Sequence, residues 1–219
     1  MKKYKAIIMD YDQTIGDTAD LILECLYENA KQFGIITDPQ AMRRGLGGTA
    51  ADLYRCSGID DEDLLKKLDD SYAVYSVEPM MTKPGFFPGV AEGLAALKQR
   101  GITLAIFSMK DSAQIHAPLA RCGLSEYISA VVGADNVSRG KPDPEGLYKL
   151  EQLLGLCADD ILYVGDSMND QRTAIAGGVD FAAVCTGFCT AEDFDRNHTV
   201  VICPTFSDLC RVVCAELDK

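Results

Sequence analysis

Short apolar segments alternate with segments of helical periodicity along most of this 219-residue chain. The apolar segments cover residues 4–9, 102–107, 130–132, 161–164 and 181–185, with a weaker candidate at 200–203. Continuous apolar runs of this length are typical of strands that are buried on both faces of a sheet. Strands that alternate with helices need crossover connections, so the pattern predicts a Rossmann-like three-layer α/β core with a parallel sheet.

One long stretch departs from this alternation. Between residues 18 and 82 the apolar positions follow helical spacing only, as at Ile22, Leu26 and Ala30. A segment rich in glycine and proline at residues 83–89 then marks the return to the α/β pattern. We therefore expect an all-helical domain at 17–83, inserted into a core domain made of 1–16 and 84–219.

Composition and charge narrow the classes of function. Hydrophobic residues make up 47% of the chain, enough for a packed core, and the formal net charge is −12. Such an acidic protein is repelled by nucleic acid and by anionic lipid, so neither is an expected partner. The apolar run near the N-terminus is much shorter than a secretory signal or a membrane span of about 20 residues requires. A cytoplasmic location is expected, in which the nine cysteines are free thiols.

Side chains that can carry chemistry lie directly after the predicted strands. They are Asp10 and Asp12 after the first strand, Ser108 after the second, Lys141 in the loop after the third, and Asp166 after the fourth. Ligands of open α/β sheets bind at the carboxyl ends of the strands, so these side chains are expected to converge. Three close carboxylates repel one another unless they share a cation, and their hard oxygens suit Mg²⁺.

The remaining groups of this cluster fit a phosphate. Ser108 supplies a hydrogen-bond donor, and Lys141 supplies a positive charge for phosphate oxygens. Aspartate can also act as a nucleophile and form an aspartyl phosphate. The residues therefore predict Mg²⁺-dependent phosphoryl transfer.

Four motifs in a fixed order resemble those of the haloacid dehalogenase-like hydrolases. They are Asp10-x-Asp12-x-Thr14, Ser108, Lys141-Pro142 and Gly165-Asp166-x-x-x-Asp170. Two flanking segments, Ile15-x-Asp17-Thr18 and Phe87-Pro88-Gly89-Val90, resemble the phosphoglycolate-phosphatase-like branch. The resemblance covers the whole chain, and the helical insert is similar to the helical cap of that family.

The resemblance implies a role for each motif residue. Asp10 would be the nucleophile and a metal ligand, and Asp12 would protonate the leaving group and then activate water. The main-chain carbonyl of Asp12 and the carboxylate of Asp166 would complete the protein ligands of Mg²⁺. The phosphoryl group would be bound by Ser108, the amide of Met109 and Lys141. Thr14 and Asp170 would support these residues. Asp170 would do so by holding metal-bound water or by orienting Lys141.

Two features leave the substrate open. Gln13 stands where the family usually has glycine, and its side chain either restricts the sharp turn beside the phosphate or contacts the substrate. Arg43, Arg44 and Gly45 form a basic, glycine-rich segment in the insert. This segment either reads a second anionic group of the substrate or is a solvated turn.

The expected function is therefore a phosphatase that acts on a small phosphorylated metabolite, with phosphoglycolate as the first substrate to consider. Alternatives on the same core are a phosphomutase of the β-phosphoglucomutase type, a pyrophosphatase and a nucleotidase. A protein that binds phosphate without turnover is a further alternative. The sequence does not indicate an oligomeric state.

Overall fold

A six-stranded parallel sheet forms the centre of the α/β part of the molecule. The computed structural model describes residues 2–219, and within them the strand order is β5-β4-β1-β6-β7-β8. The strands are β1 (Ala6–Met9), β4 (Thr103–Phe107), β5 (Ala130–Val132), β6 (Ile161–Gly165), β7 (Asp180–Val184) and β8 (Val201–Cys203). This sheet confirms the predicted fold class, and each predicted apolar segment overlaps a strand.

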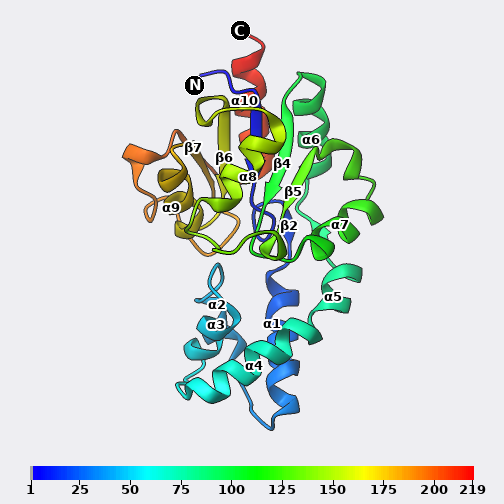
Figure 1. Cartoon of the computed structure of the whole chain (residues 1–219), viewed down its shortest axis with the longest axis vertical. Helices are drawn as coiled ribbons and strands as arrows, with labels where there is room; N and C mark the ends of the chain where they lie inside the picture. Colours follow the sequence, from blue (N-terminus) through cyan, green and yellow to red (C-terminus); the bar gives the residue numbers. More distant parts are fainter. Residues whose placement is uncertain (1) are drawn as a thin grey trace.

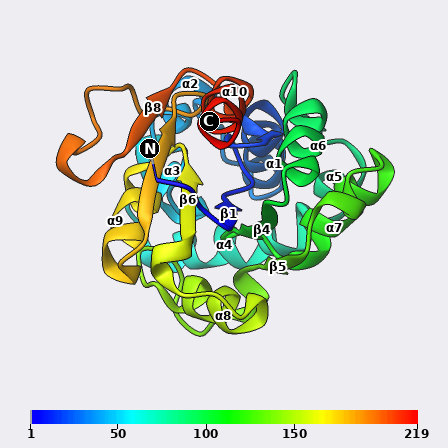
Figure 2. The same ribbon diagram turned by 90° about the horizontal axis from the view of Figure 1, so that it is seen from above.

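Helices cover both faces of the sheet (Figure 2). One face packs against α6 (Val90–Gln99), α7 (Ser112–Arg121) and α10 (Phe206–Leu217). The other packs against α8 (Glu145–Leu154) and α9 (Met168–Gly177). Alternate residues of β1 enter the two apolar cores, Ile7 on one face and Ile8 on the other, and both are fully buried.

Five helices form a separate unit below the strand ends (Figure 1). This helical unit consists of α1 (Ala19–Gln32), α2 (Pro39–Arg43), α3 (Ala50–Cys56), α4 (Glu62–Tyr75) and α5 (Val77–Thr82). Its own apolar core includes Leu26, Tyr54 and Leu68. The buried amide of Asn29 donates to the Tyr54 hydroxyl at 2.9 Å and to the Leu68 carbonyl at 3.0 Å, which ties α1 to α3 and α4.

Two short antiparallel strands join the helical unit to the sheet. They are β2 (Gly16–Asp17) and β3 (Gly85–Phe86), which the apolar pattern does not reveal because each has only two residues. They hold the outgoing and returning chain together just beyond β1. The domain boundaries at 16/17 and 83/84 stay a prediction, and Met1 lies outside the described residues.

The remaining elements are short 3₁₀ helices. They are η1 (Ser125–Tyr127), η2 (Ala134–Asn136), η3 (Ala158–Asp160) and η4 (Arg196–His198). Among residues 2–219, no helix has the length and apolar character needed to cross a membrane.

Candidate active site

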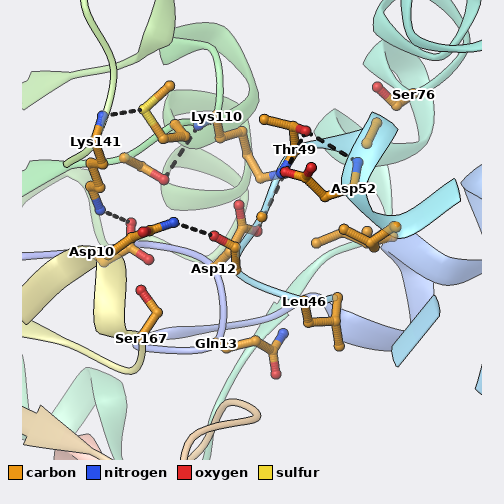
Figure 3. A pocket seen from close by; sticks show the side chains of 18 of the residues that line it. Asp10, Asp12, Gln13, Leu46, Thr49, Asp52, Ser76, Lys110, Lys141 and Ser167 are labelled. Atoms are coloured by element: carbon orange, nitrogen blue, oxygen red, sulfur yellow. Dashed lines mark hydrogen bonds and ion pairs between the residues drawn. The ribbon is translucent and has the colours of Figure 1, made fainter. Parts of the chain in front are cut away.

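The ends of three neighbouring strands bring Asp10, Ser108 and Asp166 together. Asp10 follows β1, Ser108 follows β4 and Asp166 follows β6, and β1 pairs with both other strands. The backbone N–H of Asp10 donates to the Val164 carbonyl at 2.8 Å, so the hydrogen bonding between β1 and β6 continues as far as Asp10. All three side chains are buried and line one cavity at the strand ends. Figure 3 shows Asp10 in this cavity beside Lys141.

A buried cluster of carboxylates occupies this end of the cavity. One oxygen each of Asp10, Asp166 and Asp170 lie within 4.8 Å of one another. Asp170 is already saturated, because it accepts from the Tyr163 hydroxyl at 2.9 Å, the Lys141 Nζ at 2.7 Å and both the N–H and hydroxyl of Ser167. Asp10 and Asp166 retain free lone pairs, so they are the better ligands for a cation.

Lys141 is the cation that the protein itself supplies to this cluster. Its Nζ lies 2.8 Å from Asp10 and 2.7 Å from Asp170, and its side chain is only 5% exposed. The ammonium also lies 5.1 Å from the ring centre of Phe107 and 5.4 Å from that of Tyr163. Desolvation acts to lower the pKa of Lys141, but the two aspartates outweigh it, so the pKa is raised and the side chain stays charged.

One lysine does not neutralise three buried carboxylates. Burial raises the pKa of Asp10 to about 6, against the opposing effect of Lys141. Burial also raises the pKa of Asp166 well above its usual range, with Asp170 and Asp10 adding to the effect. A divalent cation at this point would supply the missing positive charge, so the electrostatics of the cluster fit a metal site.

Asp12 points toward the helical unit instead of into the carboxylate cluster. Its Oδ1 accepts from the Thr18 hydroxyl at 2.6 Å and lies 3.3 Å from the Nζ of Lys110. The side chain of Lys110 is 6% exposed and also contacts the Met80 sulfur. Sequence reasoning missed Lys110, because a single lysine two residues after Ser108 carries no signal of burial.

Two further residues predicted from the motifs lie at the cluster. Thr14 donates its hydroxyl to Asp166 at 3.1 Å, which orients that carboxylate. The Met109 side chain is 48% exposed. Within the described residues, the structure gives the backbone N–H of Met109 no hydrogen-bond partner, so this donor is free to bind an anion.

Gln13 forms the turn between the Asp10–Asp12 segment and the helical unit. Its φ is +57°, and no other non-glycine residue in the described chain has a positive φ. The Gln13 side chain is buried beside the N-terminus of α1. With its carbonyl oxygen turned toward the helix, it accepts from the N–H groups of Ala19 at 2.6 Å and Thr18 at 3.0 Å. Because the Thr18 hydroxyl is used by Asp12, Gln13 caps α1 in its place.

Two substitutions of Gln13 should separate the energetic cost of its left-handed backbone from the stabilisation that its side chain gives by capping α1. In Gln13→Gly, relief of the left-handed backbone offsets the lost cap, each about 1 kcal/mol, so the free energy of unfolding should change little. Gln13→Ala keeps the strain and loses the cap, so we expect destabilisation by about 1–2 kcal/mol in urea unfolding. Gln32→Ala, at the exposed end of the same helix, is the control. Equal stability of Gln13→Ala and the native chain would show that the side chain does not cap α1.

The helical unit closes the cavity from the opposite side. The cavity has a volume of about 550 Å³ and lies between the strand ends and the α3–α4 part of this unit. Asn169 of α9 donates to the carbonyl of Gly47 at 3.1 Å, so the loop between α2 and α3 contacts the α/β part of the molecule directly. Arg43 and Arg44 are exposed and do not line the cavity, and Arg43 forms an ion pair with Asp20. Gly45 is also outside the cavity lining.

Comparison with known proteins places the chain in a family. Residues 7–184 match the family model described as haloacid dehalogenase-like hydrolase. The chain belongs to the haloacid dehalogenase-like hydrolases. This assignment confirms the resemblance carried by the four motifs, and the buried aspartate cluster of this hydrolase can hold a metal ion.

Relatives of this haloacid dehalogenase-like hydrolase are named phosphatases. It is 32% identical to "Probable phosphatase IndB" of Dickeya dadantii (strain 3937), over 93% of this chain and 90% of that protein. It is 30% identical to the phosphoglycolate phosphatase of Shigella boydii serotype 4, over 89% of this chain and 74% of the relative. The protein is therefore a hydrolase of the phosphatase type.

A solved structure agrees with the whole fold. The crystal structure of a Bacteroides fragilis protein assigned to the haloacid dehalogenase-like hydrolases superposes with a TM-score of 0.85 at 30% identity. The match covers 94% of this chain and 100% of the other, so it includes the helical unit as well as the sheet.

Proposed function

We propose that this hydrolase is a Mg²⁺-dependent phosphatase that hydrolyses small phosphate monoesters through an aspartyl phosphate on Asp10. The observation that carries the proposal is the placement of Asp10. Its carboxylate lines the cavity, 2.8 Å from the ammonium of Lys141 and next to the carboxylate of Asp166, which retains free lone pairs. A nucleophile, a phosphate-binding cation and a metal ligand therefore meet at one point.

The donor set fits Mg²⁺. Asp10, Asp166 and the main-chain carbonyl of Asp12 would hold the ion, since hard oxygen donors suit it and Lys141 alone does not balance the charge of the buried carboxylates. When bound, Mg²⁺ would neutralise charge on the carboxylates and on the phosphoryl oxygens. Asp170 would hold Lys141 in place, because its oxygens are fully occupied by protein donors.

The first half of the proposed reaction transfers the phosphoryl group to the enzyme. An oxygen of Asp10 attacks phosphorus, and the bond from phosphorus to the leaving oxygen breaks. Ser108, the N–H of Met109 and Lys141 bind the phosphoryl oxygens during transfer. Asp12 acts as the general acid of this step and donates a proton to the leaving alkoxide.

The second half returns the enzyme to its starting state. The Asp12 carboxylate takes a proton from water, the water oxygen attacks phosphorus, and the bond from phosphorus to Asp10 breaks. Thr18 and Lys110 hold Asp12 between Asp10 and the helical unit, where the leaving group must lie. The helical unit acts as a cap that excludes bulk water and contacts the leaving group.

Phosphate release tests this proposal. We expect the purified protein to release inorganic phosphate from small monoesters with Mg²⁺, and to lose this activity after chelation. Phosphoglycolate is included because relatives are named for it. Transfer of the phosphoryl group to a second sugar hydroxyl, without net phosphate release, would instead indicate a phosphomutase. Binding of Mg²⁺ and phosphate analogues with no transfer would indicate a protein without turnover.

A glycine outside the four motifs, Gly187, should also be needed for the proposed metal site, because it leaves room for the Asp166 carboxylate. The backbone of Gly187 lies so close to Asp166 that an added Cβ would stand 1.8 Å from its Oδ2. Gly187→Ala should displace this carboxylate and weaken Mg²⁺ affinity by about tenfold or more, measured by calorimetry. Gly85→Ala is the matched control, because its Cβ would meet no atom within 4 Å. Unchanged affinity in Gly187→Ala would remove Asp166 from the proposed ligands.

A further inference from the structure

The charges on the cavity wall are unevenly distributed. Seven aspartates and two lysines line the cavity, and the structure places no arginine in this lining among residues 2–219. Four of the aspartates, Asp10, Asp12, Asp166 and Asp170, belong to the phosphoryl end described above. The other three, Asp52, Asp69 and Asp111, line the rest of the cavity and are also exposed to solvent.

Two of these three come from the helical unit. Asp52, near the start of α3, is held by the Thr49 hydroxyl at 2.7 Å and by Arg55 at 3.2 Å. Asp69 lies on α4, and the structure gives its carboxylate no hydrogen bond or ion pair within the described residues. Burial raises the pKa of Asp69, and the neighbouring Asp70 adds to this effect, which the opposing effect of Lys66 does not cancel.

The third carboxylate and an unpaired amide come from the core. Asp111 precedes α7, and its side chain makes no capping hydrogen bond there. One turn further on, Gln114 lines the cavity and is only 7% exposed. In the described part of the chain, the Gln114 side chain has no hydrogen-bond partner. Because this nearly buried side chain lines the cavity, its amide is available for a polar contact with the leaving group.

Both lysines of the cavity are already used at the phosphoryl end. Lys141 lies between Asp10 and Asp170, and Lys110 lies 3.3 Å from Asp12. The basic pair Arg43 and Arg44 is exposed outside the cavity. No uncommitted cation in the described lining is therefore available for a second anionic group of a substrate.

We propose that the site selects phosphate monoesters whose leaving alcohol carries no anionic group, with amino alcohols and small polyols as the favoured class. This inference rests on the proposed phosphatase function and concerns the leaving group alone. A carboxylate or second phosphate on the leaving group would enter a part of the cavity lined by Asp69 and Asp111, where the lining offers no uncommitted cation, and like charges repel. A hydroxyl or ammonium can instead donate to these carboxylates and to the carbonyl of Gln114.

Three esters of nearly equal size test the proposal. 2-Phosphoglycolate, 2-hydroxyethyl phosphate and O-phosphoethanolamine differ in the leaving group by a carboxylate, a hydroxyl and an ammonium. We would measure kcat/KM with Mg²⁺ for each, and also the affinity of each for Asp10→Asn. Both non-anionic esters should exceed phosphoglycolate by at least about tenfold. The proposal is overturned if phosphoglycolate equals or exceeds 2-hydroxyethyl phosphate or O-phosphoethanolamine both in kcat/KM and in affinity for Asp10→Asn. Where no ester is turned over, the same result in affinity alone overturns it.

The affinities keep this proposal separate from the proposed function. No turnover of any ester, together with the expected order of affinities, would contradict the phosphatase and support the charge selection. In the double variant Asp69→Asn/Asp111→Asn, the preference for the two non-anionic esters over phosphoglycolate should decrease by about threefold to tenfold. Asp70→Asn is the control, because Asp70 pairs with Lys66 at 2.8 Å and does not line the cavity. A preference that narrows equally in the control would overturn the assignment to Asp69 and Asp111.

Discussion

Replacement of Asp10 by asparagine is expected to lower kcat by at least about four orders of magnitude for every ester that the enzyme hydrolyses. The amide cannot form the aspartyl phosphate, and it also removes a negative charge from the proposed metal site. The fold should be retained, because the amide oxygen of Asn can still accept from Lys141 and a buried negative charge is replaced by a neutral group. Steady-state phosphate release and circular dichroism measure the two effects.

The control for this experiment is Asp159→Asn. The side chain of Asp159 is 95% exposed at η3, which precedes β6, whereas Asp166 follows that strand at its other end. Loss of the Asp159 carboxylate should therefore leave kcat unchanged. Retention of more than a few per cent of kcat in Asp10→Asn, without deamidation back to aspartate, would exclude Asp10 as the nucleophile.

The second large effect is expected for Lys141→Met. The substitution removes the one protein cation among the buried carboxylates, so kcat should fall by about three orders of magnitude. The metal-free protein should also lose about 3–5 kcal/mol of unfolding free energy, the usual cost of breaking a buried ion pair. Addition of Mg²⁺ should restore part of this stability but not the activity.

The stability loss of Lys141→Met should depend on pH in a defined direction. The pKa of Asp10 is raised in the folded state, so this residue favours folding at low pH and the benefit disappears as the pH rises through about 6. Below that value Asp10 is protonated and needs no counter-ion, so the variant should lose less stability there. Lys149→Met, which breaks the partly exposed pair with Glu145 away from the carboxylate cluster, should lose much less stability than Lys141→Met at either pH. A loss that does not vary with pH would contradict the charge argument.

Much of the fold and of the phosphoryl end could be predicted from the sequence. Parallel strands bury both faces, so β1, β4 and β6 appear as apolar runs, and residues just after them must meet at one edge of the sheet. This is why Asp10, Ser108 and Asp166 could be placed together from local patterns alone. The two-residue strands β2 and β3 were missed because they are too short to show periodicity.

The leaving-group end could not be predicted in the same way. Arg43 and Arg44 stood out as basic residues beside glycines, yet the structure leaves them exposed, and their role stays a hypothesis. Asp69 and Gln114 carry no sequence signal, since their position depends on how α4 and α7 pack across the cavity. Gln13 was recognised as a departure from the glycine usual there, but its capping of α1 depends on Thr18 being used by Asp12.

The central claim is that the phosphoryl group passes through Asp10. Its most direct test is an acid quench during steady-state turnover of a reactive monoester with Mg²⁺, followed by peptide mass spectrometry of the trapped enzyme. We predict a phosphoryl group on Asp10, present only with Mg²⁺ and absent in Asp10→Asn. A phosphoryl group on Asp12 or on any other residue, or full turnover with no trapped enzyme at any quench time, would contradict this mechanism.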